Sequence, residues 1–445
     1  MMKKKIANWG NYPAMTSDEK SFAFDEQLRE LFTSEHHFIP RGNGRCYGDA
    51  SLADVTISTL KYDNVLSFDT INGVFECQSG ITLDQVLEVI IPKGWFLPVT
   101  PGTKFITIGG AVASDVHGKN HHVDGCFSRH VAEMDILTGT GETITCSPTQ
   151  FPDLFEATCG GMGLTGIITR VKFRLKKIDT AYIKQKQVKA ENLEEVLALF
   201  DKYKDYTYSV AWIDCLKQGK DFGRSILMLG EHAKMEDLNE KQKAEPLKLA
   251  SKKQFTLPFN LPSWGLNNVT VKTFNFLFYN KSSKKEINNV VSYEPFFYPL
   301  DVVLHWNRMY GRKGFVQYQF VLPLEAKQGL IDILNTIRTS GMGSFLTVLK
   351  VFGKQDNMIS FPKEGYTLAM DFAVTDRLME FLDKLDKIVL KNGGRLYMSK
   401  DARMKPSALS GGYSRLEEFK SVVKKYNPQY KFRSLQSDRL LLTKN

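Results

Sequence analysis

Residues 101–125 (PGTKFITIGGAVASDVHGKNHHVDG) constrain this chain most, because glycines alternate there with short apolar runs and a cluster of polar side chains follows. Glycine has no Cβ, so its backbone can approach a ligand closely and adopt positive φ. The paired Gly109 and Gly110 precede small residues, which predicts a floor for a large flat ligand. Free backbone N–H groups in such a loop can also bind a pyrophosphate. The stretch therefore predicts a dinucleotide site, with the polar cluster of Asp115, His117, Lys119, His121 and His122 at the ligand's reactive end.

Two further glycine-dense segments, 41–49 (RGNGRCYGD) and 160–166 (GGMGLTG), belong to the same half of the chain. In the first, Arg41 and Arg45 add positive charge that suits a phosphate. That loop lacks the Lys-Ser/Thr ending of a P-loop and opens no long helix, so it matches neither a P-loop nor a Rossmann fingerprint. Three such loops in one domain indicate one extended cofactor that all of them touch.

The composition changes near residues 176–179, where the glycine loops end, and a chain of 445 residues exceeds one ordinary core. We therefore expect two domains. Apolar spacing predicts helices over 17–38, 81–94 and 190–205. Beyond residue 314, strands alternate with helices in an order that predicts an antiparallel sheet backed by helices, hence an α+β fold.

The segment 232–256 is strongly charged and poor in large apolar residues, which predicts a mobile loop. The apolar segment that follows, FTLPFNLPSWGL at 255–266, is interrupted by Pro258 and Pro262. It has two interpretations, an ordinary buried crossing or a lid that touches lipid.

The net charge of +10 favours an anionic partner, but the basic residues are spread out and no nucleic-acid-binding motif occurs, so we expect no nucleic acid. The first residues lack an apolar signal-peptide core, and no window is apolar enough to span a membrane. These features predict a cytoplasmic protein. The six cysteines form no CxxC, which argues against disulfides or a zinc cage.

Several candidate catalytic residues are unusual for their surroundings, but the local pattern does not assign them a role. His117, His121 and His122 lack a nearby acidic or cysteine cluster, so we expect no metal; orienting a cofactor or a purely structural role are the alternatives. Lys350 interrupts an apolar strand, as Gln317 does, and alternation alone could turn either toward water. No G-x-S-x-G elbow supports a hydrolase.

Five motifs together resemble the vanillyl-alcohol oxidase family of FAD-binding, PCMH-type oxidoreductases, and within it the polyprenylphosphoryl-ribose oxidases. They lie at 41–49, 101–122, 160–168, 316–323 and 393–403. The likeness covers nearly the whole chain, and HGKNHH and LYMSKDAR are its most specific parts. It implies a two-domain α+β fold: an FAD-binding domain at 1–178, a substrate domain at 179–394, and a segment 395–445 that returns to the first domain.

The resemblance also implies site residues. Lys400, His117 and Tyr397 would be catalytic, and Gln317, Lys350 and Lys400 would bind substrate. Arg45 and Cys46 stand where covalent relatives carry a histidine, so it implies non-covalent FAD. The residues expected to contact FAD are Arg41, Gly42, Asn43, Gly44, Arg45, Cys46, Tyr47, Gly48, Asp49, Gly102, Thr107, Ile108, Gly109, Gly110, Ser114, Asp115, Val116, His117, Ile167 and Tyr397.

The implied activity is oxidation of a secondary alcohol, the 2'-hydroxyl of a polyprenylphosphoryl ribose, to a ketone. This would be the first half of an epimerisation in cell-wall polysaccharide synthesis, completed by a separate NAD(P)-dependent reductase. A lipid-linked substrate implies peripheral contact at the inner membrane face. The alternatives are a soluble alditol or aldonolactone oxidase acting on a sugar alcohol, and a non-catalytic flavin- or lipid-surface-binding protein.

Overall fold

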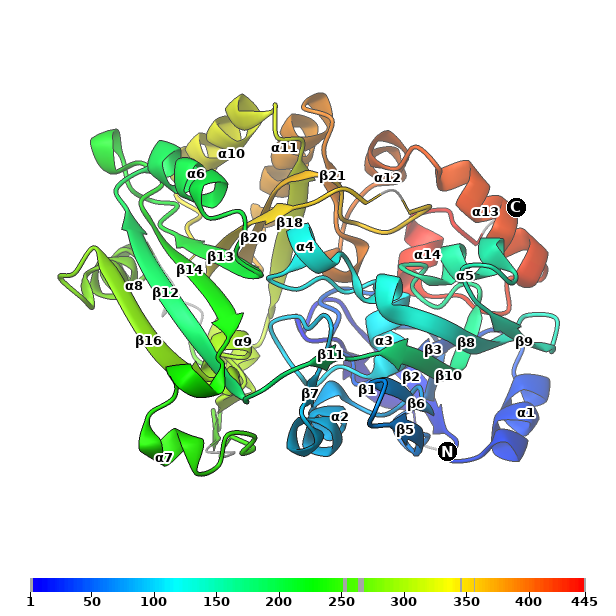
Figure 1. Ribbon diagram of the computed structural model, residues 1–445. Helices are drawn as coiled ribbons and strands as arrows, with labels where there is room; N and C mark the ends of the chain where they lie inside the picture. The colour runs from blue at the N-terminus through cyan, green and yellow to red at the C-terminus, as the bar shows by residue number, and fades with distance from the viewer. Residues whose placement is uncertain (1–2, 251–253, 263–267, 345, 356, 444–445) are drawn as a thin grey trace.

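The computed structural model describes residues 3–250, 254–262, 268–344, 346–355 and 357–443 (Figure 1). The blue, cyan and red parts of the chain form one lobe, and the green to yellow middle forms the other. We refer to them as the glycine-rich lobe and the sheet lobe. The chain therefore leaves the first lobe, builds the second, and returns.

A four-stranded sheet of order β1-β2-β4-β3 opens the glycine-rich lobe. β1 pairs antiparallel with β2, whereas β4 runs parallel to β2 and β3. The helix expected over 17–38 is shorter than predicted, because residues up to Ser21 extend a strand that pairs with β4 and the helix begins only at Asp25. The elements are β1 (Lys4–Ala7), β2 (Ala14–Ser21), α1 (Asp25–Ser34), β3 (Ile39–Arg41) and β4 (Val55–Ser58).

A second, five-stranded antiparallel sheet of order β5-β6-β10-β8-β9 completes this lobe with its helices. Helix α2 shows why these elements form: Thr82 and Gln85 make a capping box, the apolar stripe is buried, and Gly94 ends the turn that follows at φ 77°. The elements are β5 (Val65–Asp69), β6 (Val74–Gln78), α2 (Leu83–Ile90), β7 (Trp95–Phe96), α3 (Ile108–Ala113), α4 (His121–Asp124), β8 (Val131–Thr138), β9 (Thr143–Cys146), α5 (Pro152–Thr158), β10 (Gly166–Arg174) and β11 (Lys176–Lys177).

The sheet lobe is built on eight strands in the order β16-β12-β14-β13-β19-β20-β18-β21, and every pairing is antiparallel, as expected for the α+β fold. Helices α6, α10 and α11 gather on one side of it in Figure 1. Its elements are β12 (Tyr182–Ala190), α6 (Leu193–Lys202), β13 (Tyr208–Ile213), β14 (Ser225–His232), β16 (Glu286–Ser292), β18 (Phe315–Leu322), α10 (Lys327–Ser340), β19 (Thr347–Phe352), β20 (Gly365–Ala373), α11 (Leu378–Lys391) and β21 (Arg395–Leu396).

Short elements connect β14 to β18. The mobile loop expected at 232–256 instead contains a 3-10 turn and α7, and its residues 251–253 lie outside the described chain. Of the apolar segment 255–266, residues 263–266 also lie outside it. The elements are α7 (Glu240–Lys243), β15 (Phe255–Thr256), α8 (Asn268–Asn280), α9 (Tyr293–Phe297) and β17 (Val303–Leu304). No helix in the described ranges is long and apolar enough to cross a membrane.

The last segment returns to the first strands through α12 (Pro406–Gly412), α13 (Leu416–Tyr426) and α14 (Leu435–Arg439). Phe38 donates its N–H to the carbonyl of Lys431 at 2.9 Å, and Leu435 donates to that of Leu52 at 2.8 Å. The side chains of Phe38 and Phe432 pack edge to face at 5.3 Å. The two ends of the chain thus share one core.

Candidate active site

A cavity of about 1100 Å³ lies between the glycine loops and one face of the eight-stranded sheet. Side chains two residues apart line it, such as Val348 and Lys350 of β19, because successive side chains of a strand point to opposite faces. The helices cover the other face. The polar residues that interrupt apolar strands, Gln317 and Lys350, therefore face the cavity rather than bulk water.

Most of the residues expected from the sequence meet at this cavity. Those that line it are Gly42, Asn43, Gly44, Arg45, Cys46, Tyr47, Gly102, Thr107, Gly109, Gly110, Ser114, Val116, His117, Gln317, Lys350, Tyr397 and Lys400. All three glycine loops reach it, since Met162 and Gly163 of the third also belong to its wall.

The structure places the remaining expected residues behind the cavity wall, as supports. Arg41 donates to the carbonyls of Ala7 and Ser51, and Ile108 and Ile167 lie in the core. The residues expected to contact the cofactor but not lining the cavity are Arg41, Gly48, Asp49, Ile108, Asp115 and Ile167.

Asp115 is one of these supports and lies fully buried, with φ at 39°. Its carboxylate accepts hydrogen bonds from the N–H of Ser128 at 3.1 Å and from the hydroxyl of Ser360 at 2.5 Å. Burial raises the pKa of this carboxyl. Asp115 thus ties the turn before His117 to the loop after β19.

Gly42 and Gly109 are required by close approach at the cavity floor. A Cβ on Gly42 would lie 2.4 Å from the hydroxyl oxygen of Thr107, and one on Gly109 would lie 2.9 Å from Cβ of Ser79. Thr107 caps α3 by accepting from the N–H of Gly110 at 3.1 Å. The absence of side chains lets the first two loops meet under the cavity, as the dinucleotide interpretation expected.

Lys400 ends a 3-10 turn that follows β21, and its ammonium lies 3.7 Å from the ring centroid of Tyr47. Burial lowers the pKa of Lys400 to about 7, and the positive charge of Lys350 also lowers it, whereas Asp371 raises it. Burial alone lowers the pKa of Lys350 to about 8. Two lysines that can be charged near neutral pH thus border one apolar-walled space.

Asp371 provides the counter-charge from β20. Its carboxylate accepts hydrogen bonds from the amide of Gln317 at 2.6 Å and the hydroxyl of Tyr310 at 3.2 Å. Burial raises its pKa to about 7. Ala369, two residues earlier on the same strand, lines the cavity.

His117 packs between Phe352, at 4.7 Å between ring centroids, and Tyr397, at 5.5 Å. Burial holds its pKa well below the usual range, with further lowering by Lys350, so the ring is neutral. The amide of Gln319 donates to Nε2 at 3.2 Å, which leaves the proton on Nδ1. Nδ1 has no hydrogen-bond partner among the described residues, so it is an unsatisfied buried donor.

Several cavity residues were not predicted. Gln319 also lines the cavity, and its spacing of two from Gln317 on the same strand was the available signal. Lys119 also lines the cavity, and its ammonium donates to the carbonyls of Phe296 at 2.5 Å and Phe297 at 3.3 Å in α9. Burial lowers the pKa of Lys119 to about 7. Nothing in the sequence indicated these contacts.

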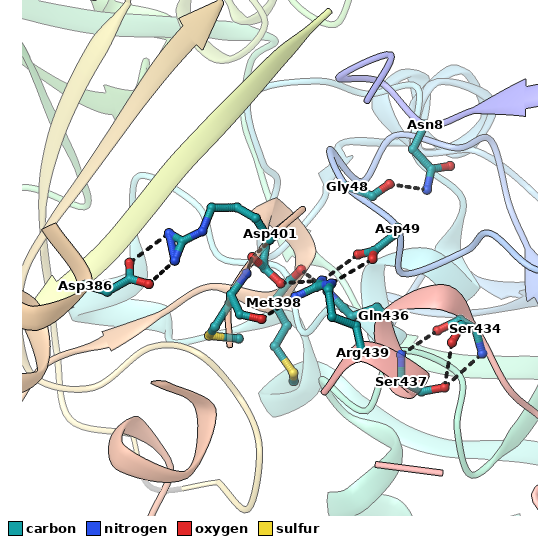
Figure 2. Close-up of polar contacts among 12 residues, drawn as sticks. Asn8, Gly48, Asp49, Asp386, Met398, Asp401, Ser434, Gln436, Ser437 and Arg439 are labelled. Carbon is teal, nitrogen blue, oxygen red and sulfur yellow. Dashed lines mark hydrogen bonds and ion pairs between the residues drawn. The ribbon is translucent and has the colours of Figure 1, made fainter. Parts of the chain in front are cut away.

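The return of the chain fixes the Lys400 turn (Figure 2). The guanidinium of Arg439 in α14 lies between the carboxylates of Asp49 and Asp401, at 2.8 and 2.7 Å. The amide of Gln436 donates to the carbonyl of Met398 at 2.8 Å. The segment that carries Lys400 is therefore held on both sides.

The cavity fits FAD. Its volume exceeds the range of roughly 300–1,000 Å³ usual for small-ligand sites, which suits a dinucleotide with a substrate beside it. The side-chain-free floor at Gly109 and Gly110 suits a flat ring or a pyrophosphate, and Nδ1 of His117 and Oγ of Ser79 are buried polar atoms without partners among the described residues. Within those same residues, no group of three or more His, Cys, Asp or Glu side chains is placed to hold a metal ion.

Comparison with known proteins agrees with this geometry. Residues 26–147 match the model of an FAD binding domain family. A decaprenylphosphoryl-beta-D-ribose oxidase of Mycolicibacterium smegmatis is 37% identical over 99% of this chain and 98% of its own length. An uncharacterized protein of Streptomyces coelicolor is 30% identical over 81% of this chain and 100% of its own, and cytokinin dehydrogenase 8 of Oryza sativa is 26% identical over 37% and 29%.

The fold and the cavity thus define an FAD-dependent oxidoreductase of the vanillyl-alcohol oxidase type. Within that class, full-length similarity decides the finer grouping. The chain belongs to the decaprenylphosphoryl-beta-D-ribose oxidase family.

Proposed function

We propose that this enzyme oxidises the 2'-hydroxyl of a polyprenylphosphoryl ribose to the 2'-ketone, the first half of an epimerisation. The observation that carries the proposal is the 37% identity to a decaprenylphosphoryl-beta-D-ribose oxidase over both whole chains. The cavity supports it, because a cofactor and a large substrate need more room than either alone. A separate NAD(P)-dependent reductase would complete the epimerisation, and we expect the enzyme to meet its lipid-linked substrate at the membrane surface.

We assign the cofactor site to the three glycine loops together with Tyr397. FAD bound there would supply the electron acceptor: the carbinol carbon would give up a hydride to it and the hydroxyl group would release a proton, which leaves the ketone. Binding is proposed to be non-covalent, because Arg45 and Cys46 occupy the place of the histidine in covalent relatives. Neutral His117 would donate a hydrogen bond from Nδ1 to the cofactor. The hydroxyl of Tyr397 fixes this part of the cavity wall by donating to the carbonyl of Ser114 at 2.8 Å.

The catalytic roles follow from charge and position. The Lys400 ammonium would stabilise the negative charge that a bound flavin gains on taking up the hydride, the kind of stabilisation that is largest in a water-poor site. Gln317 and Lys350 hold the sugar and its polar groups from the sheet side. The cavity walls exclude water from the reacting atoms.

We further propose that the chain divides functionally into an FAD-binding domain at 1–178, a substrate domain at 179–394 and a returning segment at 395–445. The shared core of Phe38 and Phe432 supports the return. The position of Lys400 in that segment explains why the catalytic cation comes so late in the sequence.

The test is anaerobic reduction of the bound flavin. A prenylphosphoryl ribose should bleach the flavin absorbance rapidly, whereas free alditols and aldonolactones should not. Bleaching by the free sugars alone would replace the substrate assignment with the alditol or aldonolactone alternative. A protein that binds FAD and is bleached by neither would contradict turnover altogether.

A further inference from the structure

Two segments beside the cavity present large apolar side chains to solvent. In residues 255–262, Phe255 is 59% exposed and Phe259 63% exposed. In helix α8, Phe276 is 56% and Leu277 62% exposed. A water-soluble surface rarely gathers such side chains without a partner. We refer to residues 255–262 together with α8 as the apolar face.

The apolar side chains project from backbone that is hydrogen-bonded to the body of the protein. Phe255 donates its N–H to the carbonyl of Val302 at 3.0 Å. Helix α8 buries Val271 and Asn275, and the amide of Asn275 donates to Asp214 at 2.8 Å. The buried side of the helix thus already packs against the protein, and the exposed apolar side chains lie on its other side.

The cavity reaches the surface at this face. Phe274 and Lys281 of the α8 region line the cavity and are themselves exposed, as is Gln254 at the start of the other segment. An apolar chain that leaves the cavity here would meet the apolar face directly.

The positive charge around the apolar face indicates the kind of partner that it binds. Residues 246–285 contain seven lysines and no acidic residue. Lys272 is exposed and lies one helical turn from Phe276, so cationic and apolar groups share the same surface of α8. Helices that lie in a membrane interface combine apolar side chains with lysines, which attract anionic headgroups.

We propose that the apolar face docks on an anionic phospholipid bilayer, with the cavity opening at the membrane surface. This inference rests on the proposed function, because a polyprenyl-linked substrate would then pass from the bilayer into the cavity without crossing water. The phenylalanine and leucine side chains enter the headgroup region, and the exposed Lys272, Lys281 and Lys284 contact the phosphates.

The test is co-sedimentation of the FAD-loaded enzyme with phosphatidylcholine vesicles and with vesicles that also contain phosphatidylglycerol. The wild type should sediment with the phosphatidylglycerol vesicles and be released by salt. Phe276→Ser combined with Leu277→Ser should weaken binding at least about tenfold, since two large apolar contacts are lost. Lys272→Glu should weaken it about fivefold or more.

Matched controls lie on the other lobe. Ile71, in the turn between β5 and β6, is 86% exposed, and Lys61, before β5, is also exposed. Ile71→Ser and Lys61→Glu should bind vesicles as the wild type does. Equal loss in these controls, or no loss in the α8 variants, would overturn the docking proposal.

A second copy of the chain is the competing occupant of the apolar face. If Phe276→Ser with Leu277→Ser converts a dimer to a monomer in vesicle-free light scattering, the face joins subunits and the membrane proposal is wrong. Flavin reduction by a short-chain, water-soluble prenylphosphoryl ribose separates this inference from the proposed function. The flavin of the α8 variants should be reduced as fast as that of the wild type. If the short-chain substrate does not reduce the wild-type flavin, the substrate assignment is wrong, whereas the vesicle-binding result is unaffected.

Discussion

The guanidinium of Arg439 lies 2.7 Å from the carboxylate of Asp401, the residue that directly follows Lys400. The same guanidinium contacts Asp49 through two hydrogen bonds of 2.8 and 3.0 Å. Asp49 ends the first glycine loop, so one side chain from the last helix joins that loop to the turn that carries Lys400. Arg439 is therefore a positioning residue for Lys400.

Arg439→Met is expected to lower both stability and catalysis. Both carboxylates are buried, and removing one partner of a buried ion pair costs about 3–5 kcal/mol of unfolding free energy. If Lys400 then moves by about 1 Å, flavin reduction should slow on the order of a hundredfold. Urea unfolding and anaerobic stopped-flow absorbance measure the two effects.

Arg439→Lys serves as the matched variant. The lysine keeps the positive charge and should recover part of the reduction rate, but it cannot replace both hydrogen bonds of the guanidinium to Asp49. A reduction rate that stays at the wild-type value in both variants, together with lowered stability, would leave Arg439 with a structural role only.

The sequence predicted which residues meet at the cavity better than how the cavity is assembled. The glycine spacing at 101–125 predicted the floor of the cavity, because close approach demands specific residues at specific places. The two-residue periodicity of β18 could not by itself tell whether Gln317 faces water or a cavity, since that depends on which lobe covers the sheet. The partnership of Arg439 and Asp401 joins positions with no local pattern, and only the folded chain shows it.

The α+β class was predictable because helices and strands follow local apolar spacing. The helix expected over 17–38 began too early, because Phe22 and Phe24 fit helical spacing while β2, which ends at Ser21, pairs with β4. Pairing with a distant strand outweighed local preference there.

Reduction of the flavin should depend on pH through Lys400. Its pKa is about 7, and the proposed role requires the charged form, so the rate should fall as pH rises through about 7. Asp371 raises that pKa, so Asp371→Asn should move the midpoint to lower pH. Single-turnover reduction across a pH series measures both midpoints.

Two substitutions of Lys400 complete this test. Lys400→Arg keeps the charge at every pH and should give a flat profile near neutrality. Lys400→Ala should retain FAD but slow reduction on the order of 10²–10³-fold. A wild-type midpoint unchanged in Lys400→Arg would assign the titration to another group.

Gly48→Ala should prevent the first glycine loop from meeting the Lys400 turn. A Cβ at Gly48 would lie 1.7 Å from the carbonyl oxygen of Asp401, and backbone cannot yield there without moving the turn. We expect a loss of about 2–4 kcal/mol in unfolding free energy, typical of overpacking against fixed atoms, and poor FAD retention. Thermal unfolding and the flavin-to-protein absorbance ratio measure these.

Gly411→Ala is the contrasting glycine substitution. Gly411 lies in α12, and a Cβ there would make only ordinary contact with Leu390 at 3.4 Å. Alanine favours a helix over glycine by up to about 1 kcal/mol, so this variant should be as stable as the wild type or more so. Equal destabilisation by both substitutions would remove the close approach as the cause.

His117 and His121 provide a paired test of the buried donor. Both rings are neutral and lie against Phe352, at 4.7 and 4.5 Å between centroids, and burial lowers the pKa of His121 to about 3. His121 has partners for both nitrogens, Gln355 at 3.0 Å and the N–H of Gly353 at 3.2 Å. His117 has a partner only for Nε2 within the described chain.

His117→Phe should therefore weaken FAD binding about tenfold and cost the apoprotein little stability, because an unpaired buried N–H is removed and Gln319 keeps its hydrogen bond to Thr367. His121→Phe should lower apoprotein stability more, by about 1–3 kcal/mol, because both of its partners lose a hydrogen bond. Fluorescence titration of FAD and apoprotein melting separate the two effects. If His117→Phe binds FAD as tightly as the wild type, Nδ1 does not contact the cofactor.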